Sequence, residues 1–67
     1  MNVTAKEFKS YLEVQVSGVY NMFSQDAIDA TGLDKETYMY LLKHYGQLVE
    51  KYKEDPGCKD ILARLGY

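Results

Sequence analysis

Residues 35–52, KETYMYLLKHYGQLVEKY, decide the fold of this chain. Apolar side chains recur through them at three-and-four spacing, which places them on one face of a helix. The members of this stripe are Tyr38, Leu41, Tyr45, Leu48 and Tyr52, widened by Leu42 and Val49. The pattern predicts one helix from Lys35 to about Glu54, roughly 30 Å long. Gly46 lies inside it and either admits another helix closely or marks a bend.

Capping and stop signals place a first helix before this one. Thr4 and Glu7 match the capping-box pattern, in which each side chain accepts a hydrogen bond from the other residue's backbone N–H. Gly18 is the natural stop, because glycine adopts the left-handed conformation without steric cost. Val14–Val16 also alternates like a short strand, so the choice between helix and strand stays open there.

Two shorter helices complete the predicted set. Either Asn21 or Ser24 can cap a second helix that stops at Gly32. We expect its inner face to carry Phe23, Ala27, Ile28, and Ala30 or Thr31. Asp55 and Pro56 end the long helix and are also suited to start the last one, with the carboxylate as N-cap. The apolar face of that last helix consists of Ile61, Leu62 and Leu65.

Length and composition restrict the fold to one small domain. The 67 residues are too few for more than one core, so we expect a single helical domain over residues 1–67. Its predicted class is all-α, a small bundle of three to four helices with a helix-turn-helix-like centre. Seven tyrosines and two phenylalanines, with no tryptophan, either line the edge of a thin core or provide anchors for a partner.

Side chains suited to catalysis or metal binding are few. Cys58 and His44 are the only thiol and imidazole, and they lie on different predicted helices. One cysteine and one histidine cannot form a disulfide or supply the ligands of a structural zinc site. Phosphate-binding loops and glycine-rich nucleotide motifs are missing from the sequence. We therefore predict a protein that is not an enzyme and needs no cofactor or metal.

The distribution of apolar residues predicts a cytoplasmic protein. The longest uninterrupted apolar run, residues 38–42, is far shorter than the roughly 20 residues that span a bilayer. The first residues turn polar at once, unlike a secretory signal, and an unpaired thiol suits a reducing compartment. A net charge of −2 argues against strong non-specific attraction to nucleic acid or anionic lipid.

Residues 24–43 resemble a helix-turn-helix unit, with a short helix, a turn at Gly32 and a second helix. In a DNA reader the second helix would enter the major groove and expose Lys35, Glu36, Thr37, Met39, Tyr40 and Lys43. Asp26 and Asp29 on the first helix oppose phosphate binding, and the second helix has no arginine for base recognition. The alternative interpretation is that these two helices pack together only as part of the fold and do not contact DNA.

Three short segments resemble small accessory proteins of tailed bacteriophages. They are residues 17–23 (SGVYNMF), 30–33 (ATGL) and 45–52 (YGQLVEKY). The resemblance covers roughly residues 7 to 53 and brings no active site with it. It implies a product that binds host machinery or blocks host defence in the cytoplasm of the host cell, through an aromatic and acidic surface.

One face of the long helix is a candidate binding surface. Met39 and Tyr40 lie away from the apolar stripe and have no predicted role in the core, although burial against the first or last helix stays an alternative. The predicted partner-binding residues are Lys35, Glu36, Met39, Tyr40 and Lys43.

The sequence therefore favours a small non-catalytic regulator or inhibitor that acts by protein–protein binding. The partner is either a component of host machinery or a second copy of the chain. One alternative is a sequence-specific DNA-binding repressor built on residues 24–43. The other is an assembly protein that forms homodimers or larger homo-oligomers through Tyr38, Tyr45 and Tyr52.

Overall fold

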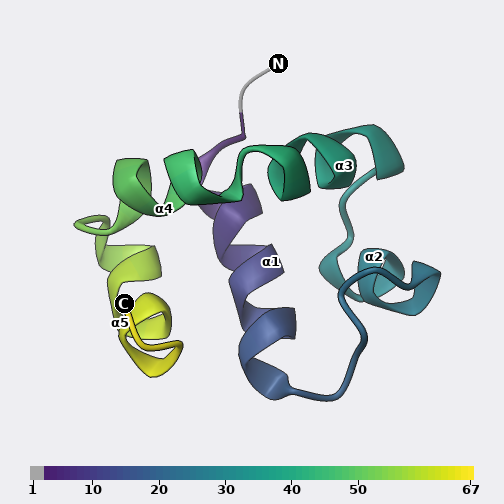
Figure 1. Ribbon diagram of the computed structural model, residues 1–67, viewed down its shortest axis with the longest axis horizontal. Coiled ribbons are helices and arrows are strands. Elements are labelled where there is room, and N and C mark those ends of the chain that lie inside the picture. The colour runs from purple at the N-terminus through teal and green to yellow at the C-terminus, as the bar shows by residue number, and fades with distance from the viewer. Residues whose placement is uncertain (1–2) are drawn as a thin grey trace.

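The computed structural model describes residues 3–67, and these residues form five helices and no strand. The helices are α1 (Ala5–Ser17), α2 (Gln25–Thr31), α3 (Lys35–Lys43), α4 (Tyr45–Tyr52) and α5 (Pro56–Arg64). The predicted all-α class is confirmed. Figure 1 shows α1 at the centre, with α3 and α4 passing across it one after the other and with α2 and α5 on opposite sides. Within this arrangement α1 packs against both α2 and α5.

The capping signals begin the helices where the sequence predicts. Thr4 Oγ1 accepts from the Glu7 amide at 3.1 Å, and Glu7 Oε1 accepts from the Thr4 amide at 2.9 Å, which completes the capping box of α1. The helix continues to Ser17, so Val14–Val16 is helical. Gly18 then takes a φ of 70°, a left-handed conformation that a side chain would strain.

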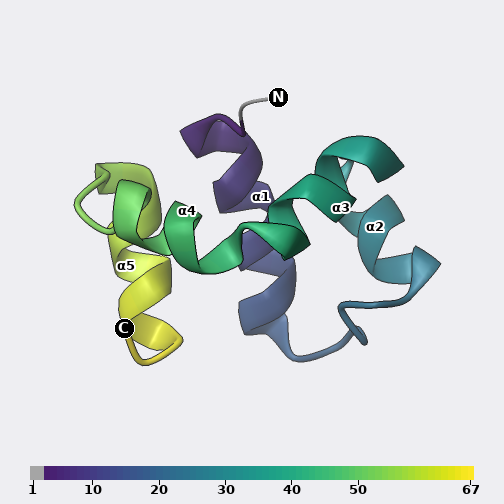
Figure 2. The same cartoon turned by 45° about the horizontal axis from the view of Figure 1, so that its top comes forward.

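The predicted helix from Lys35 to about Glu54 is wrong in one respect, because it breaks at His44. This residue has φ −113° and ψ 22°, outside the helical range, and separates α3 from α4. Its ring lies 4.3 Å from the Tyr40 ring, and its Nδ1 is 3.1 Å from Gln47 Oε1. The bundle consequently has five helices instead of three to four, and Figure 2 shows the bend between the two segments as they cross α1.

Tyrosines of both segments, α3 and α4, pack on α1. The Tyr38 ring lies 5.4 Å from Tyr11, the Tyr45 ring 5.9 Å from Phe8, and the Tyr52 ring 5.8 Å from Phe8. Such aromatic pairs contribute about 0.5–1.5 kcal/mol each beyond the area they bury.

Each of these three tyrosines also has a hydrogen-bond partner inside the chain. The Tyr38 hydroxyl donates to the Met22 carbonyl at 2.6 Å, the Tyr45 hydroxyl to Gln15 Oε1 at 3.1 Å, and the Tyr52 hydroxyl to the Val3 carbonyl at 2.5 Å. The apolar stripe is thus committed to the core of one molecule. An assembly of copies through these tyrosines would have to break the contacts that hold the fold together.

Candidate functional site

Phe23 has the highest exposed fraction among the large hydrophobic side chains of the described residues, at 82%. The expectation that it lies on the inner face of the second helix is wrong. Ser24, and not Asn21, caps α2, with its Oγ accepting from the Ala27 amide at 3.3 Å. Phe23 therefore precedes the helix and does not share the face on which Ala27 and Ile28 are buried.

Hydrogen bonds hold the backbone on both sides of Phe23. Its amide donates to Asn21 Oδ1 at 2.9 Å, and the Ser24 amide donates to the Asn21 carbonyl at 2.9 Å. On the other side, the Met22 carbonyl accepts from the hydroxyl of Tyr38, whose ring is fully buried. Phe23 is thus an exposed aromatic ring on an ordered backbone, and such a group loses little conformational freedom when a partner covers it.

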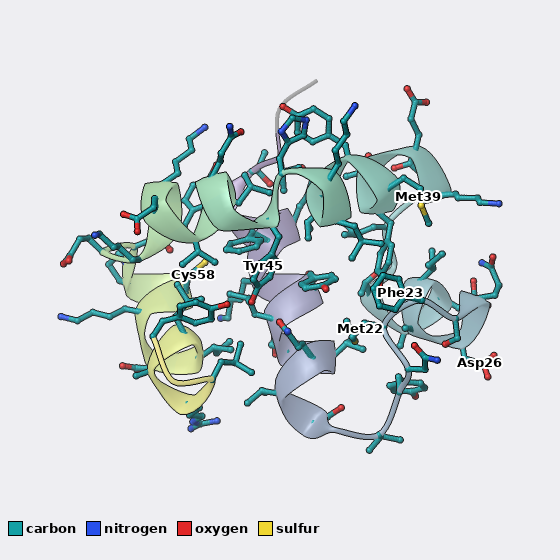
Figure 3. The ribbon with its side chains drawn as sticks, in the orientation of Figure 1. Met22, Phe23, Asp26, Met39, Tyr45 and Cys58 are labelled. Carbon is teal, nitrogen blue, oxygen red and sulfur yellow. The ribbon has the colours of Figure 1, made fainter. Side chains whose placement is uncertain are left out.

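Met39 presents a second apolar side chain to solvent from α3, with 42% of its area exposed. Lys35 and Lys43 are four residues before and after it, so the three side chains follow one exposed face of the helix. Figure 3 shows Phe23 and Met39 at the α2–α3 end of the molecule, away from Tyr45 and Cys58.

The predicted partner-binding residues fall into two groups. Lys35, Glu36, Met39 and Lys43 are exposed. Tyr40 is partly buried and packs against the core, and its ring lies 4.3 Å from the His44 ring. Tyr40 and His44 are four residues apart, a spacing at which helical side chains are neighbours.

Charged side chains surround the two apolar ones. Asp26 and Asp29 are exposed on α2, and Lys35 and Lys43 are exposed on α3. Over residues 3–67 the one ion pair joins Lys53 to Glu50, at 2.9 Å, so these four charges have no ionic partner within the described chain. We call Phe23, Asp26, Asp29, Lys35, Met39 and Lys43 together the α2–α3 surface.

The thiol and the imidazole are not arranged as a catalytic pair. Cys58 is fully buried, its Sγ is 3.6 Å from the Ala5 carbonyl, and burial raises the pKa of the thiol. His44 is at the α3–α4 break, where its ring contacts Tyr40 and Gln47. In this arrangement Cys58 packs the N-terminal end of α1 against α5, and the charged groups near its thiol are Asp55 and Lys9, not His44.

The described part of the chain lacks three other kinds of site. Residues 3–67 contain no group of three or more His, Cys, Asp or Glu side chains that could hold a metal ion. They also form no pocket. None of the described helices combines the length and the apolar composition that crossing a membrane requires.

The helix-turn-helix-like segment is present as α2, a turn at Gly32 and α3. Gly32 has a φ of 75°, as the predicted turn requires. However, α2 packs mainly on α1, and Thr37 of the expected reading face is buried, with 8% of its area exposed.

No protein-family model, curated protein or solved structure matches the chain.

Proposed function

We propose that this protein is a small non-catalytic regulator or inhibitor that acts by binding another protein through the α2–α3 surface. The observation that carries the proposal is Phe23, an aromatic side chain that is 82% exposed although the backbone on both sides of it is held by hydrogen bonds. Aromatic residues, phenylalanine included, are enriched in protein–protein interfaces relative to the rest of the surface.

The chemistry of the surface suits a folded or helical protein partner. Phe23 and Met39 offer apolar area, and Met39 adapts its shape to a facing surface. Asp26, Asp29 and the lysines of α3 offer charges that select and orient a partner. A phage-encoded protein that binds a component of its host would be one instance of this function, as the sequence resemblance implies.

A DNA-binding repressor is less well supported by the charges. The exposed lysines of α3 are accompanied by Asp34 at the start of the helix and Glu36 in its first turn, both exposed. Exposed acidic groups at the N-terminus of a reading helix repel phosphates, which otherwise contribute most of the affinity for DNA. This alternative predicts binding that weakens steeply with salt, whereas the proposed contact depends chiefly on apolar area.

A capture experiment with two matched variants tests the proposal. The immobilised protein is incubated with nuclease-treated lysate of a bacterial host, and retained proteins are compared for the wild type, Phe23→Ser and Val19→Ser. Val19 is an exposed apolar residue of the same loop, 75% exposed, but its side chain is not part of the α2–α3 surface. We expect a retained protein to bind about 30-fold more weakly to Phe23→Ser, the effect of losing roughly 2 kcal/mol at an interface anchor. Equal retention by both variants would contradict the proposal.

A further inference from the structure

We infer that the α2–α3 surface binds a second copy of this chain, with α2 of each copy against α3 of the other in a two-fold symmetric dimer. This inference rests on the proposed function, because it names a partner for the same surface. It concerns residues other than the tyrosine stripe, which the core of each molecule already uses.

The first step of the argument is charge complementarity. The exposed charges of α2 next to Phe23 are acidic, Asp26 and Asp29. The exposed charges on the α3 face around Met39 are Lys35, Lys43 and Glu36, so that face has a net charge of +1. None of these five side chains forms an ion pair within residues 3–67. One molecule therefore carries both an acidic apolar segment and an apolar segment with a net positive charge.

The second step is symmetry. In a two-fold dimer the same surface is used by both copies, so a contact between α2 of one copy and α3 of the other occurs twice. A surface with one acidic half and one basic half satisfies this condition, since the two-fold axis places unlike charges opposite each other. Figure 3 shows that the labelled residues of both halves, Phe23 and Asp26 from the α2 side and Met39 from α3, lie at the same end of the molecule.

The third step is size. A stable interface of ordinary size buries about 800 Å² on each partner. The accessible surface of the chain is 4311 Å², so such an interface would cover about a fifth of it. A domain of this length has a marginal core, and small domains of this kind often gain stability from a partner subunit. Covering Phe23 and Met39 in a second copy removes the two exposed apolar side chains of this surface from water.

Charge reversal tests the inference. One variant carries Lys35→Glu and Lys43→Glu, and the other carries Asp26→Lys and Asp29→Lys. Each variant alone would place like charges opposite each other in both halves of the dimer. An equimolar mixture of the two would again place unlike charges opposite each other at both contacts. Sedimentation velocity at low salt, from about 1 µM to about 1 mM, covers the range in which weak to moderate interfaces form.

The expected wild-type mass rises with concentration from 7.7 kDa towards twice that value. Each variant alone should need at least tenfold more protein to associate, and the equimolar mixture should regain the wild-type behaviour. Circular dichroism checks that the variants are folded. If the variant with Asp26→Lys and Asp29→Lys loses helix content, a variant with Asp29→Lys alone replaces it.

Three results would overturn the inference. In the first, the mass of the wild type stays at 7.7 kDa at every concentration. In the second, either charge-reversed variant on its own associates as readily as the wild type. In the third, both variants are folded but their equimolar mixture stays monomeric. If the wild type stays monomeric but still retains a host protein through Phe23, the dimer is wrong and the proposed function stands. Loss of both results would remove the α2–α3 surface as a binding site altogether.

Discussion

The hydrogen bond between the Tyr38 hydroxyl and the Met22 carbonyl gives the sharpest test of how the core supports the exposed loop. Tyr38→Phe removes only the hydroxyl and keeps the ring against Tyr11. The net contribution of a hydrogen bond to the free energy of unfolding is about 1 kcal/mol. Because the partly buried Met22 carbonyl would lose its partner, we expect a loss of stability of about 1–2 kcal/mol. In a domain of this size each kcal/mol lowers Tm by about 4–8 °C.

Two measurements follow this variant. Thermal unfolding by circular dichroism measures the loss of stability, and hydrogen exchange measures the protection of the Phe23 and Ser24 amides, which both donate to Asn21. Tyr45→Phe is the matched control, since its hydroxyl donates to Gln15 on α1 and does not contact the loop. We expect faster exchange at the two loop amides for Tyr38→Phe alone. Unchanged exchange and unchanged Tm in Tyr38→Phe would refute the idea that this hydroxyl holds the loop.

Three further predictions concern the rest of the fold. Thr4→Ala breaks the capping box with Glu7 and should destabilise the protein by about 1 kcal/mol in urea unfolding; an unchanged midpoint would contradict this role of the cap. Burial, followed by the nearby tyrosines, raises the pKa of Tyr11 from 10.0 to about 12. The stability that this shift contributes is therefore fully present below pH 10 and is lost as the pH rises through 12. Ultraviolet titration of the tyrosines, with circular dichroism recorded in parallel, measures this pKa. Ionisation of all the tyrosines of the folded protein near pH 10 would refute the prediction. Cys58 is fully buried with a raised thiol pKa, so a thiol reagent should label it only as fast as the protein opens, and immediate labelling of the native protein would show that it is accessible.

Local signals in the sequence determined most of the helix boundaries. The capping box at Thr4, the cap at Asp55 and the glycine stops at Gly18 and Gly32 are present where predicted, and Ser24 is the one of the two predicted caps of α2 that forms. These signals act through hydrogen bonds or backbone preferences that span only a few residues. A pattern in the sequence is therefore sufficient to find them.

The features that sequence reasoning missed depend on contacts between distant residues. The three-and-four spacing of residues 35–52 continues through His44, so nothing in the pattern marks the break beyond the nearby Gly46. The tyrosines on both sides of the break contact Phe8 and Tyr11 of α1. The spacing of apolar residues in 35–52 does not by itself show how α3 and α4 cross α1.

The candidate site was predicted only in part. Helical spacing found Lys35, Met39 and Lys43, because four-residue steps keep them on one exposed face. It misplaced Phe23, since a start at Asn21 would have included this residue in the helix, whereas a start at Ser24 leaves it outside. Choosing Ser24 instead of Asn21 as the cap would have placed Phe23 outside the helix. The hydrogen bond that fixes the loop could not be found in this way, because Tyr38 is 16 residues after Met22 in the chain.

Photo-crosslinking from position 23 tests the central claim, that the α2–α3 surface binds protein, most directly. Phe23 is replaced with p-benzoylphenylalanine, which keeps an exposed aromatic ring at that position, and the same group at Lys59, exposed on α5, serves as the control. After irradiation in a bacterial host, we predict a covalent protein adduct from position 23 that is absent from position 59. No protein adduct from position 23, or the same adducts from both positions, would contradict the account.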